Sequence, residues 1–272
     1  MRARDLAELV RAPAALSVPG DIVAGAAAAQ DLGPRTAGLA GASVLLYWAG
    51  MAANDWADRE VDAKERPERP IPSGRISANA ALGVAGGLTA AAVVAAGLAG
   101  GRRALRVAVP LAGAVWAYDT RLKTPALMAT CRALNVLLGA NRRPRRAVVP
   151  AAIVFAHTYT VTALSQFEVH GATPALPRRT LAGTAAIAAA AGGTPAAAGL
   201  AAWYAIRYGR PQLDAVDKPD AEHIQRAVGA GIVNLPALQG ALTARAGKPL
   251  LGLAVAAAAP LAKRLARWVK PT

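Results

Sequence analysis

Long apolar segments alternate along the chain with short loops that are charged or contain proline. Each segment is rich in alanine and has about 15 to 27 residues, and about 20 such residues cross a bilayer as a helix. Only helices and closed barrels satisfy their backbone hydrogen bonds inside lipid, so the pattern predicts an all-α, polytopic membrane bundle. Nine spans are expected, at residues 14–30, 36–54, 78–99, 103–119, 127–141, 147–166, 180–206, 223–243 and 248–268.

Composition supports a membrane protein. The chain is 54% apolar and only 17% charged, with a mean hydropathy of +0.31, whereas soluble domains carry about a quarter charged residues. No membrane-free segment of useful size remains, so residues 1–272 are predicted to form a single transmembrane domain. No cleavable signal peptide is evident, because residues 1–13 are charged and amphipathic. We expect a multi-pass protein of the cell membrane.

The basic residues are spread over many loops. A net charge of +15 could suggest a nucleic-acid partner, but no basic domain is present to hold a duplex. Attraction to the anionic headgroups of the lipid bilayer explains the charge better, and we expect no nucleic acid. With nine spans, Lys and Arg divide almost evenly between the two sides, so the positive-inside rule does not choose an orientation.

One acidic stretch, NDWADREVDAKERPERPIPSG at 54–74, follows the second apolar segment. On a helix, Asp55, Asp58 and Asp62 fall within roughly 60° of one another, and Asn54 lies one turn before Asp58. Carboxylates this close repel, and a hard divalent cation would reverse the sign of that interaction. Mg²⁺ commonly binds one or two carboxylates together with phosphate oxygens. The alternative is a solvated helix end that only terminates the span.

A basic loop is expected directly after this acidic stretch. Three prolines forbid a continuing helix, so residues 66–74 should form an ordered loop. Arg66, Arg69 and Arg75 could reach phosphate oxygens, which a guanidinium fork suits. The alternative for any single arginine is an ion pair with Glu65 or Glu68, and this alternative is favoured.

Three polar residues beyond the fourth span are further candidates for substrate contact. These three, Tyr118, Arg121 and Lys123, lie just past a membrane boundary together with Asp119, and Lys123 could make a second phosphate contact. Lys and Tyr are also ordinary interfacial anchors, so each residue alone carries little weight.

Polar residues inside the spans should face the interior of the bundle. Arg132 and Asn135 lie one turn apart in the fifth span, and a buried Arg needs an acceptor. A structural hydrogen bond to another helix is favoured over a substrate contact. Asp21 in the first span either lines a pore or pairs with a buried cation, and pairing is favoured. The single cysteine, Cys131, excludes an intramolecular disulfide.

A polar stripe marks the sixth span and its end. Tyr159, Thr162 and Ser165 recur at helical spacing and lead to Glu168, so the stripe should face a cavity or a neighbouring helix. The sequence DAVDKPD at 214–220 offers more acids, but it follows the seventh span. If that span crosses the membrane once, these acids emerge on the opposite face and cap the next helix instead.

The motifs together resemble the UbiA superfamily of intramembrane prenyltransferases. The first aspartate-rich motif of that family, NDxxDxxxD, is intact at 54–62, and its Tyr-x-x-x-Leu-Lys element matches at 118–123. The resemblance covers residues 11–171 and, more loosely, the nine-span plan. It departs after the sixth span, where SQFEVHG replaces a second aspartate-rich motif and Glu168 is the only carboxylate. In this the chain is similar to the divergent EboC-like branch.

The resemblance implies Mg²⁺-dependent transfer of a prenyl group from a polyprenyl diphosphate to an unidentified acceptor. The motif carboxylates and Asn54 would hold Mg²⁺ against the diphosphate, while Lys123 and the loop arginines neutralise the leaving group. Tyr118, Tyr159 or Tyr47 could stabilise the allylic cation.

Glu168 would then help to bind metal or remove a proton. A non-enzymatic carrier or scaffold that binds a lipid diphosphate is the main alternative to this enzyme. CDP-alcohol phosphotransfer is disfavoured because its DG-x-x-AR element is missing.

Overall fold

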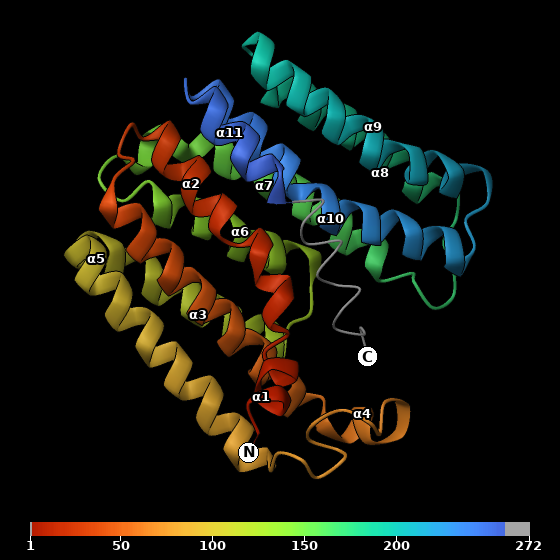
Figure 1. Ribbon diagram of the computed structural model, residues 1–272. Coiled ribbons are helices and arrows are strands. Elements are labelled where there is room, and N and C mark those ends of the chain that lie inside the picture. The colour runs from red at the N-terminus through yellow and green to blue at the C-terminus, as the bar shows by residue number, and fades with distance from the viewer. Residues whose placement is uncertain (1, 259–272) are drawn as a thin grey trace.

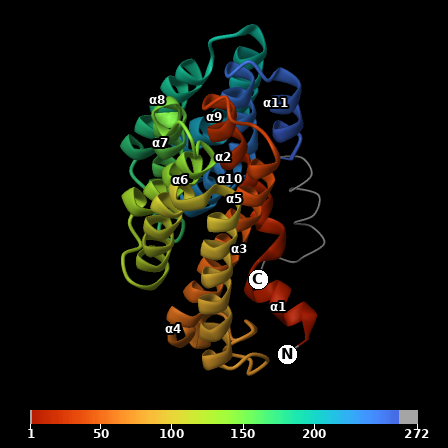
Figure 2. The same cartoon turned by 90° about the vertical axis from the view of Figure 1, so that its left-hand side faces the viewer.

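The computed structural model describes residues 2–258, and within that range every regular element is a helix (Figure 1). The helices pack into a membrane bundle with their long axes roughly aligned (Figures 1 and 2). Their bounds are α1 (Ala3–Leu9), a 3₁₀ helix (Ala12–Ser17), α2 (Pro19–Ala28), α3 (Pro34–Ala57), α4 (Arg59–Glu65), α5 (Ala78–Thr120), α6 (Pro125–Gly139), a 3₁₀ helix (Pro144–Ala147), α7 (Val148–Ser165), α8 (Ala175–Ala191), α9 (Pro195–Asp217), α10 (Ala221–Arg245) and α11 (Pro249–Ala256).

Four of these segments are long and apolar enough to cross a membrane by length and composition. They are α3, α5, α10 and the segment Pro144–Ser165 that includes α7. This agrees with the predicted polytopic all-α fold. The ninth predicted span, 248–268, begins with α11 and continues past residue 258, outside the described residues.

α5 is two antiparallel helices joined at Gly101. A straight helix of its 43 residues would be about 65 Å long, more than twice the apolar thickness of a bilayer. Gly101 has φ 66° and ψ −159°, a conformation that is nearly restricted to glycine. The two arms then run side by side, since Trp116 Nε1 donates to Thr89 Oγ1 at 2.9 Å. They match the predicted third and fourth spans.

The predicted seventh span, 180–206, is wrong, because α8 and α9 form a second helical hairpin. Thr194 caps α9 by accepting a hydrogen bond from Ala197 N, and Pro195 occupies its first position, so a new helix starts there. The two helices pack against each other (Figure 1). Gln212 Nε2 in α9 donates to Thr184 Oγ1 in α8 at 2.9 Å.

The hairpin returns the chain to the end of the bundle where α7 finishes. Ala172 N donates to Pro219 O at 2.8 Å, and Gln225 Nε2 donates to Glu168 O at 2.8 Å. The acidic segment 214–220 therefore lies at the same end as Glu168, and the predicted placement on the opposite face is also wrong.

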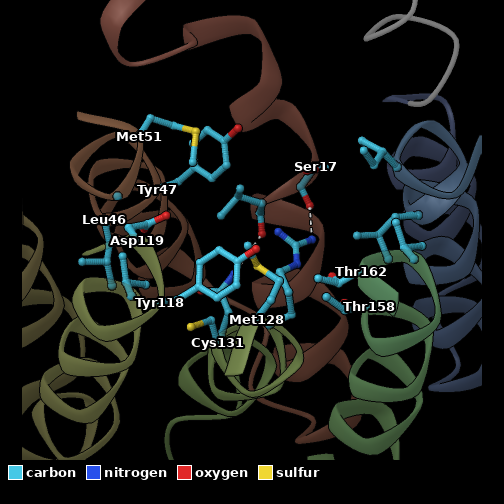
Figure 3. Close-up of a pocket in the computed structure, with 18 of the residues that line it drawn as sticks. Ser17, Leu46, Tyr47, Met51, Tyr118, Asp119, Met128, Cys131, Thr158 and Thr162 are labelled. Carbon is cyan, nitrogen blue, oxygen red and sulfur yellow. Dashed lines mark hydrogen bonds between the residues drawn. The ribbon is translucent and has the colours of Figure 1, made fainter. Parts of the chain in front are cut away.

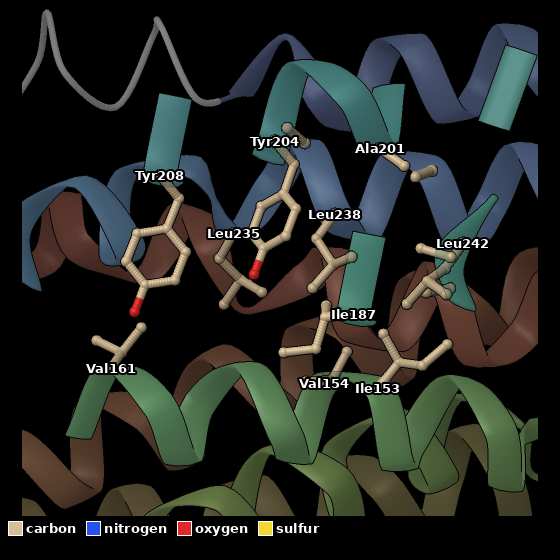
Figure 4. Close-up of a cluster of buried hydrophobic side chains, with 14 of the residues drawn as sticks. Ile153, Val154, Val161, Ile187, Ala201, Tyr204, Tyr208, Leu235, Leu238 and Leu242 are labelled. Carbon is tan, nitrogen blue, oxygen red and sulfur yellow. The ribbon is translucent and has the colours of Figure 1, made fainter. Parts of the chain in front are cut away.

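The core has two features that hold the helices together. Between α7, α9 and α10, Tyr204 and Tyr208 are fully buried among branched aliphatic side chains (Figure 4), and Tyr204 OH lies 2.9 Å from His157 Nδ1. Elsewhere small residues permit close backbone contact. A Cβ on Gly25 of α2 would lie 1.9 Å from the Val136 carbonyl oxygen of α6, which is the close approach that small residues allow in membrane bundles.

Candidate active site

The acidic motif lies where α3 leaves the bundle, beside α1 and α4 at one end of the molecule (Figure 2). Asp58 follows the last residue of α3, yet its N–H still bonds to Asn54 O at 2.9 Å, and Asp62 N bonds to Asp58 O at 2.8 Å. Helical spacing is thus kept through the motif. Asp55 and Asp62 are buried, with 4% and 2% of their surface exposed, and Asp58 is partly exposed.

Arg69 holds the two buried carboxylates together. Its Nη1 lies 2.6 Å from Asp62 Oδ2 and 3.5 Å from Asp55 Oδ1, and the Arg69 residue is itself only 7% exposed. Arg66 Nη1 lies 3.7 Å from the other oxygen of Asp62. The favoured alternative, an ion pair with Glu65 or Glu68, is therefore wrong, because the partners of both arginines are the motif aspartates. Within the described residues, Glu65 and Glu68 form no side-chain ion pair.

Two further cations reach the motif from distant parts of the chain. Arg11 Nη2 lies 3.0 Å from Asp55 Oδ1, and Lys123 Nζ donates to Asp58 Oδ1 at 2.6 Å. Arg11 has φ 46°, a left-handed conformation that is uncommon for a residue other than glycine. Such strain is often kept where a side chain must be positioned for function.

The predicted basic loop is ordered. Ser73 Oγ donates to Arg69 O at 2.6 Å, and Gly74 takes the left-handed conformation with φ 74°. Arg75 joins the loop to α1 by pairing with Glu8 at 2.7 Å and with Asp5 at 3.1 Å. The Arg75 guanidinium lowers the pKa of the Glu8 carboxyl. The loop therefore presents Arg69 from a fixed position.

The motif residues fit a hard divalent cation in their donor chemistry. They supply carboxylate oxygens, the ligands that Mg²⁺ prefers, and Arg69 keeps two of the carboxylates within reach of one positive group. In the described part of the chain, no group of three or more His, Cys, Asp or Glu side chains is arranged to hold a metal. A bound ion would therefore take the place of the Arg69 guanidinium between Asp55 and Asp62.

A cavity of about 380 Å³ opens beside the motif and extends into the bundle. It is bounded by α3, α5, α6, α7 and α10, and most of its wall is apolar (Figure 3). The polar groups in the wall include Tyr47, Tyr118, Asp119, Thr158 and Thr162. A mostly apolar cleft with a few converging polar groups is the usual form of a small-molecule site.

A buried ionic network closes the deep side of the cavity. Arg132 Nε lies 3.0 Å from Asp21 Oδ2, and Arg132 Nη2 donates to Ser17 O at 3.1 Å (Figure 3). Asn135 Nδ2 and Gln239 Nε2 donate to the same carboxylate at 3.1 and 2.6 Å. The predicted structural pairing of Arg132, Asn135 and Asp21 is confirmed.

The structure brings some of the other predicted site residues to the cavity and leaves others outside it. Tyr118 lines the cavity, as do Thr162 and Ser165 of the polar stripe. Tyr159 does not, since it is 46% exposed and its ring stacks on Phe155 at 6.3 Å between centroids. Its part in substrate binding stays a prediction.

Arg121 and Glu168 also lie away from the cavity wall. Arg121 is exposed beyond the end of α5. Glu168 lies in the loop after α7, where partial burial raises the pKa of its carboxyl. Their proposed contacts with substrate and metal stay predictions.

Sequence reasoning missed two residues that the fold brings to the site. Arg11 precedes the first span by several residues, and only its position as a lone cation at a membrane boundary marked it. Asp119 follows Tyr118 directly, and its carboxylate lines the cavity. The sequence did offer a signal for Asp119, because it is an acidic residue inside the Tyr-x-x-x-Leu-Lys element.

Fold and site together define a polytopic helical membrane protein with a cation-paired acidic motif at the mouth of an intramembrane cavity. Residues 17–140 match the model of the UbiA prenyltransferase family. An apo structure of a UbiA homologue from Aeropyrum pernix K1 is similar over 89% of this chain and 97% of that chain, with a TM-score of 0.64 and 18% identity.

Two curated relatives match shorter stretches. The chain is 42% identical over 95 residues to a digeranylgeranylglyceryl phosphate synthase of Natronomonas pharaonis, covering 34% of each chain. It is 36% identical over 143 residues to the bacteriochlorophyll synthase 33 kDa chain of Cereibacter sphaeroides, covering 49% of this chain and 45% of the relative.

These matches span less than half of either curated relative. The family match is confined to residues 17–140, and the described helices have the fold of a UbiA homologue. The likeness to the EboC-like branch stays a prediction.

Proposed function

We propose that the protein, acting as one transmembrane domain, is a Mg²⁺-dependent prenyltransferase that uses a polyprenyl diphosphate and an acceptor dissolved in the bilayer. The observation that carries this proposal is the position of the motif. Arg11 pairs with the buried Asp55 of the motif and also lines a cavity whose wall is mostly apolar. A diphosphate needs the charged mouth, and a prenyl chain needs the apolar wall.

The ion pairs suggest how the site would receive a diphosphate. Arg69 and Lys123 each hold a motif carboxylate, and each can exchange it for a phosphate oxygen, since charge-assisted contacts to phosphate are strong. The freed Asp55, Asp58 and Asp62 would then hold Mg²⁺. When bound, the ion would neutralise charge on the leaving diphosphate. Lys123 and the arginines would stabilise the same developing charge.

The cavity would keep water away from the allylic cation that remains. Its wall is mostly apolar, and Tyr47 and Tyr118 are part of that wall. An aromatic face attracts a cation within about 6 Å of the ring centroid. The relatives' names concern a geranylgeranyl lipid and a bacteriochlorophyll, so we propose an acceptor of comparable solubility in lipid.

Basic residues favour one orientation once α8 and α9 are treated as a hairpin. Among the residues that the structure describes, sixteen lie nearer to the acidic end: Arg2, Arg4, Arg11, Arg59, Lys64, Arg66, Arg69, Arg75, Arg121, Lys123, Arg178, Arg179, Arg207, Arg210, Lys218 and Arg226. Ten lie nearer to the other end: Arg35, Arg102, Arg103, Arg106, Arg142, Arg143, Arg145, Arg146, Arg245 and Lys248. The positive-inside rule then favours a cytoplasmic acidic end, and we propose the cell membrane as the location.

The decisive experiment incubates the protein in proteoliposomes with Mg²⁺ and labelled prenyl diphosphates of several chain lengths. Pyrophosphate release and the lipid product are measured together. Asp55→Ala and Asp58→Ala should abolish release, whereas Asp31→Ala should not, because Asp31 pairs with Arg142 at the opposite end. Turnover retained without Asp55 or Asp58 would refute the proposal. Mg²⁺-dependent binding with no pyrophosphate release would favour a carrier.

A further inference from the structure

Asp119 is a buried carboxylate with no polar partner in the described part of the chain. It lies in the last turn of α5, is 4% exposed, and lines the cavity. No residue of the described range donates a hydrogen bond to it or forms an ion pair with it within 4.0 Å. Buried charges are costly without a partner, and an unsatisfied buried polar group in a folded protein needs an explanation.

The neighbouring helix leaves room for this carboxylate. A Cβ on Gly50 of α3 would lie 2.6 Å from Asp119 Oδ2 and 2.9 Å from Val115 Cγ1. Any side chain at position 50 would therefore displace the carboxylate. Gly50 also precedes Asp55 by five residues, which is about 7.5 Å along a helix. Asp119 thus lies deeper in the bundle than the motif, on the side where the cavity extends.

The position of Asp119 deeper in the bundle matters for the reaction, because the allylic carbon that reacts is bonded to the diphosphate. With the diphosphate at the motif, that carbon would lie at the mouth of the cavity, and an acceptor must approach it from within the cavity. Lys123, four residues after Asp119, holds Asp58 of the motif. Asp119 is therefore joined to the phosphate side of the site by the end of α5 and the first residues of the loop that follows, and it faces the cavity.

A second unsatisfied group lies on another wall of the same cavity. Thr158 of α7 is 9% exposed, and its buried hydroxyl has no hydrogen-bond partner. Figure 3 shows Asp119 and Thr158 on different walls, α5 and α7, with the cavity between them. A lipid acceptor that carries several polar groups could bond to Asp119 with one of them and to Thr158 with another, since a hydroxyl donates one hydrogen bond and accepts others.

We propose that Asp119 is a catalytic residue that takes the proton of an alcohol acceptor, a lipid with a free hydroxyl group, while Thr158 hydrogen-bonds another polar group of that acceptor. The proposal rests on the proposed function. The C1–O bond of the prenyl diphosphate breaks, and its electron pair leaves with the diphosphate. The acceptor oxygen forms a bond to C1, and its proton passes to a carboxylate oxygen of Asp119. No further reactant is needed, and the product is an ether.

Glu168 is less suited to this step. It lies in the loop after α7 and is not part of the cavity wall, whereas Asp119 is.

The test uses the full chain in proteoliposomes with Mg²⁺, geranylgeranyl diphosphate as donor and geranylgeranylglyceryl phosphate as the alcohol. Ether product, pyrophosphate and free geranylgeraniol are measured separately. Asp119→Asn should lower ether formation by about 100-fold or more, the usual effect of a general base. Mg²⁺-dependent binding of an unreactive thiolodiphosphate analogue should remain, which shows that the variant folds.

Further variants and outcomes complete the experiment. Asp119→Glu should recover part of the activity. Thr158→Val should lower ether formation by about 5- to 10-fold, and Thr160→Val is its control, because the Thr160 hydroxyl bonds to His157 O within α7. Ether formation by Asp119→Asn within about 3-fold of wild type would overturn the proposal. So would a wild type that releases pyrophosphate and alkylates only water. A wild type that releases no pyrophosphate would overturn the proposed function itself.

Discussion

The ionic network below the cavity allows a quantitative prediction about stability. Asp21 is fully buried in α2, and its carboxylate has contacts with Arg132, Asn135 and Gln239 at 2.6 to 3.2 Å. The change Asp21→Asn keeps the size of the side chain and removes its charge. The Arg132 guanidinium would then stay inside the bundle without an anion.

The magnitude follows from the burial of both partners. Removing one partner of a buried ion pair costs about 3 to 5 kcal/mol, because the other charge is left uncompensated. The Arg132 side chain is 14% exposed, towards the cavity, so hydration recovers part of the loss. We expect Asp21→Asn to lower the free energy of unfolding by about 3 kcal/mol, or roughly 100-fold in the unfolding equilibrium.

The assay is reversible unfolding in mixed detergent micelles, with Asp31→Asn as the control. Asp31 lies 3.9 Å from Arg142 at the bundle end, and an exposed pair of this kind is worth less than about 1 kcal/mol. The double variant Asp21→Asn with Arg132→Met should recover most of the loss, because no buried charge then remains. A loss below about 1 kcal/mol in the single variant would refute the reasoning, and so would a double variant less stable than the single one.

Three more predictions concern the loops and the helix contacts. Gly101→Ala should lower the free energy of unfolding by about 1 to 3 kcal/mol, measured by unfolding in the same mixed micelles. Gly86 has open space around it, so the control Gly86→Ala should not lower this free energy. Gly139→Ala should cost about 1 to 3 kcal/mol, because its Cβ would lie 2.2 Å from Ile22 O, and an unchanged stability would contradict that contact. Arg75 lowers the pKa of Glu8, so their pairing stabilises the loop above the ordinary glutamate pKa of about 4.3 and is lost as the pH falls through the lowered value. Hydrogen exchange in residues 66–76 should rise on acidification in the wild type and lack this transition in Glu8→Gln.

Hydropathy located most helices because their apolar stretches are long and their ends carry charge. It failed at the seventh span for a physical reason. α8 begins at Ala175 and α9 ends at Asp217, yet the charged residues Arg178, Arg207 and Arg210 excluded those ends from the apolar segment. What remained looked like one long span with a break at its centre.

The acidic residues of the site could be predicted from the sequence, but the cations that pair with them could not. NDxxDxxxD is a local pattern, and its helical spacing survives in the structure. The partners of the acids are tertiary: Arg11 and Asp55 are separated by 44 residues, and Lys123 and Asp58 by 65. Asp119 was missed for the same reason, because its position depends on the close approach of α3 at Gly50.

These pairings bear on how a metal and a diphosphate would bind under the proposed function. Mg²⁺ alone would have to displace Arg69 from Asp55 and Asp62, leaving a buried guanidinium unpaired. A diphosphate alone would draw Arg69 and Lys123 away and leave Asp55 and Asp62 with one cation each, Arg11 and Arg66. Each step alone leaves buried charge less well compensated than before, which is unfavourable. When both ligands bind, every charge finds a partner. Linkage then requires each ligand to raise the affinity of the other by the same factor, so the site favours the metal–diphosphate complex over either ligand alone.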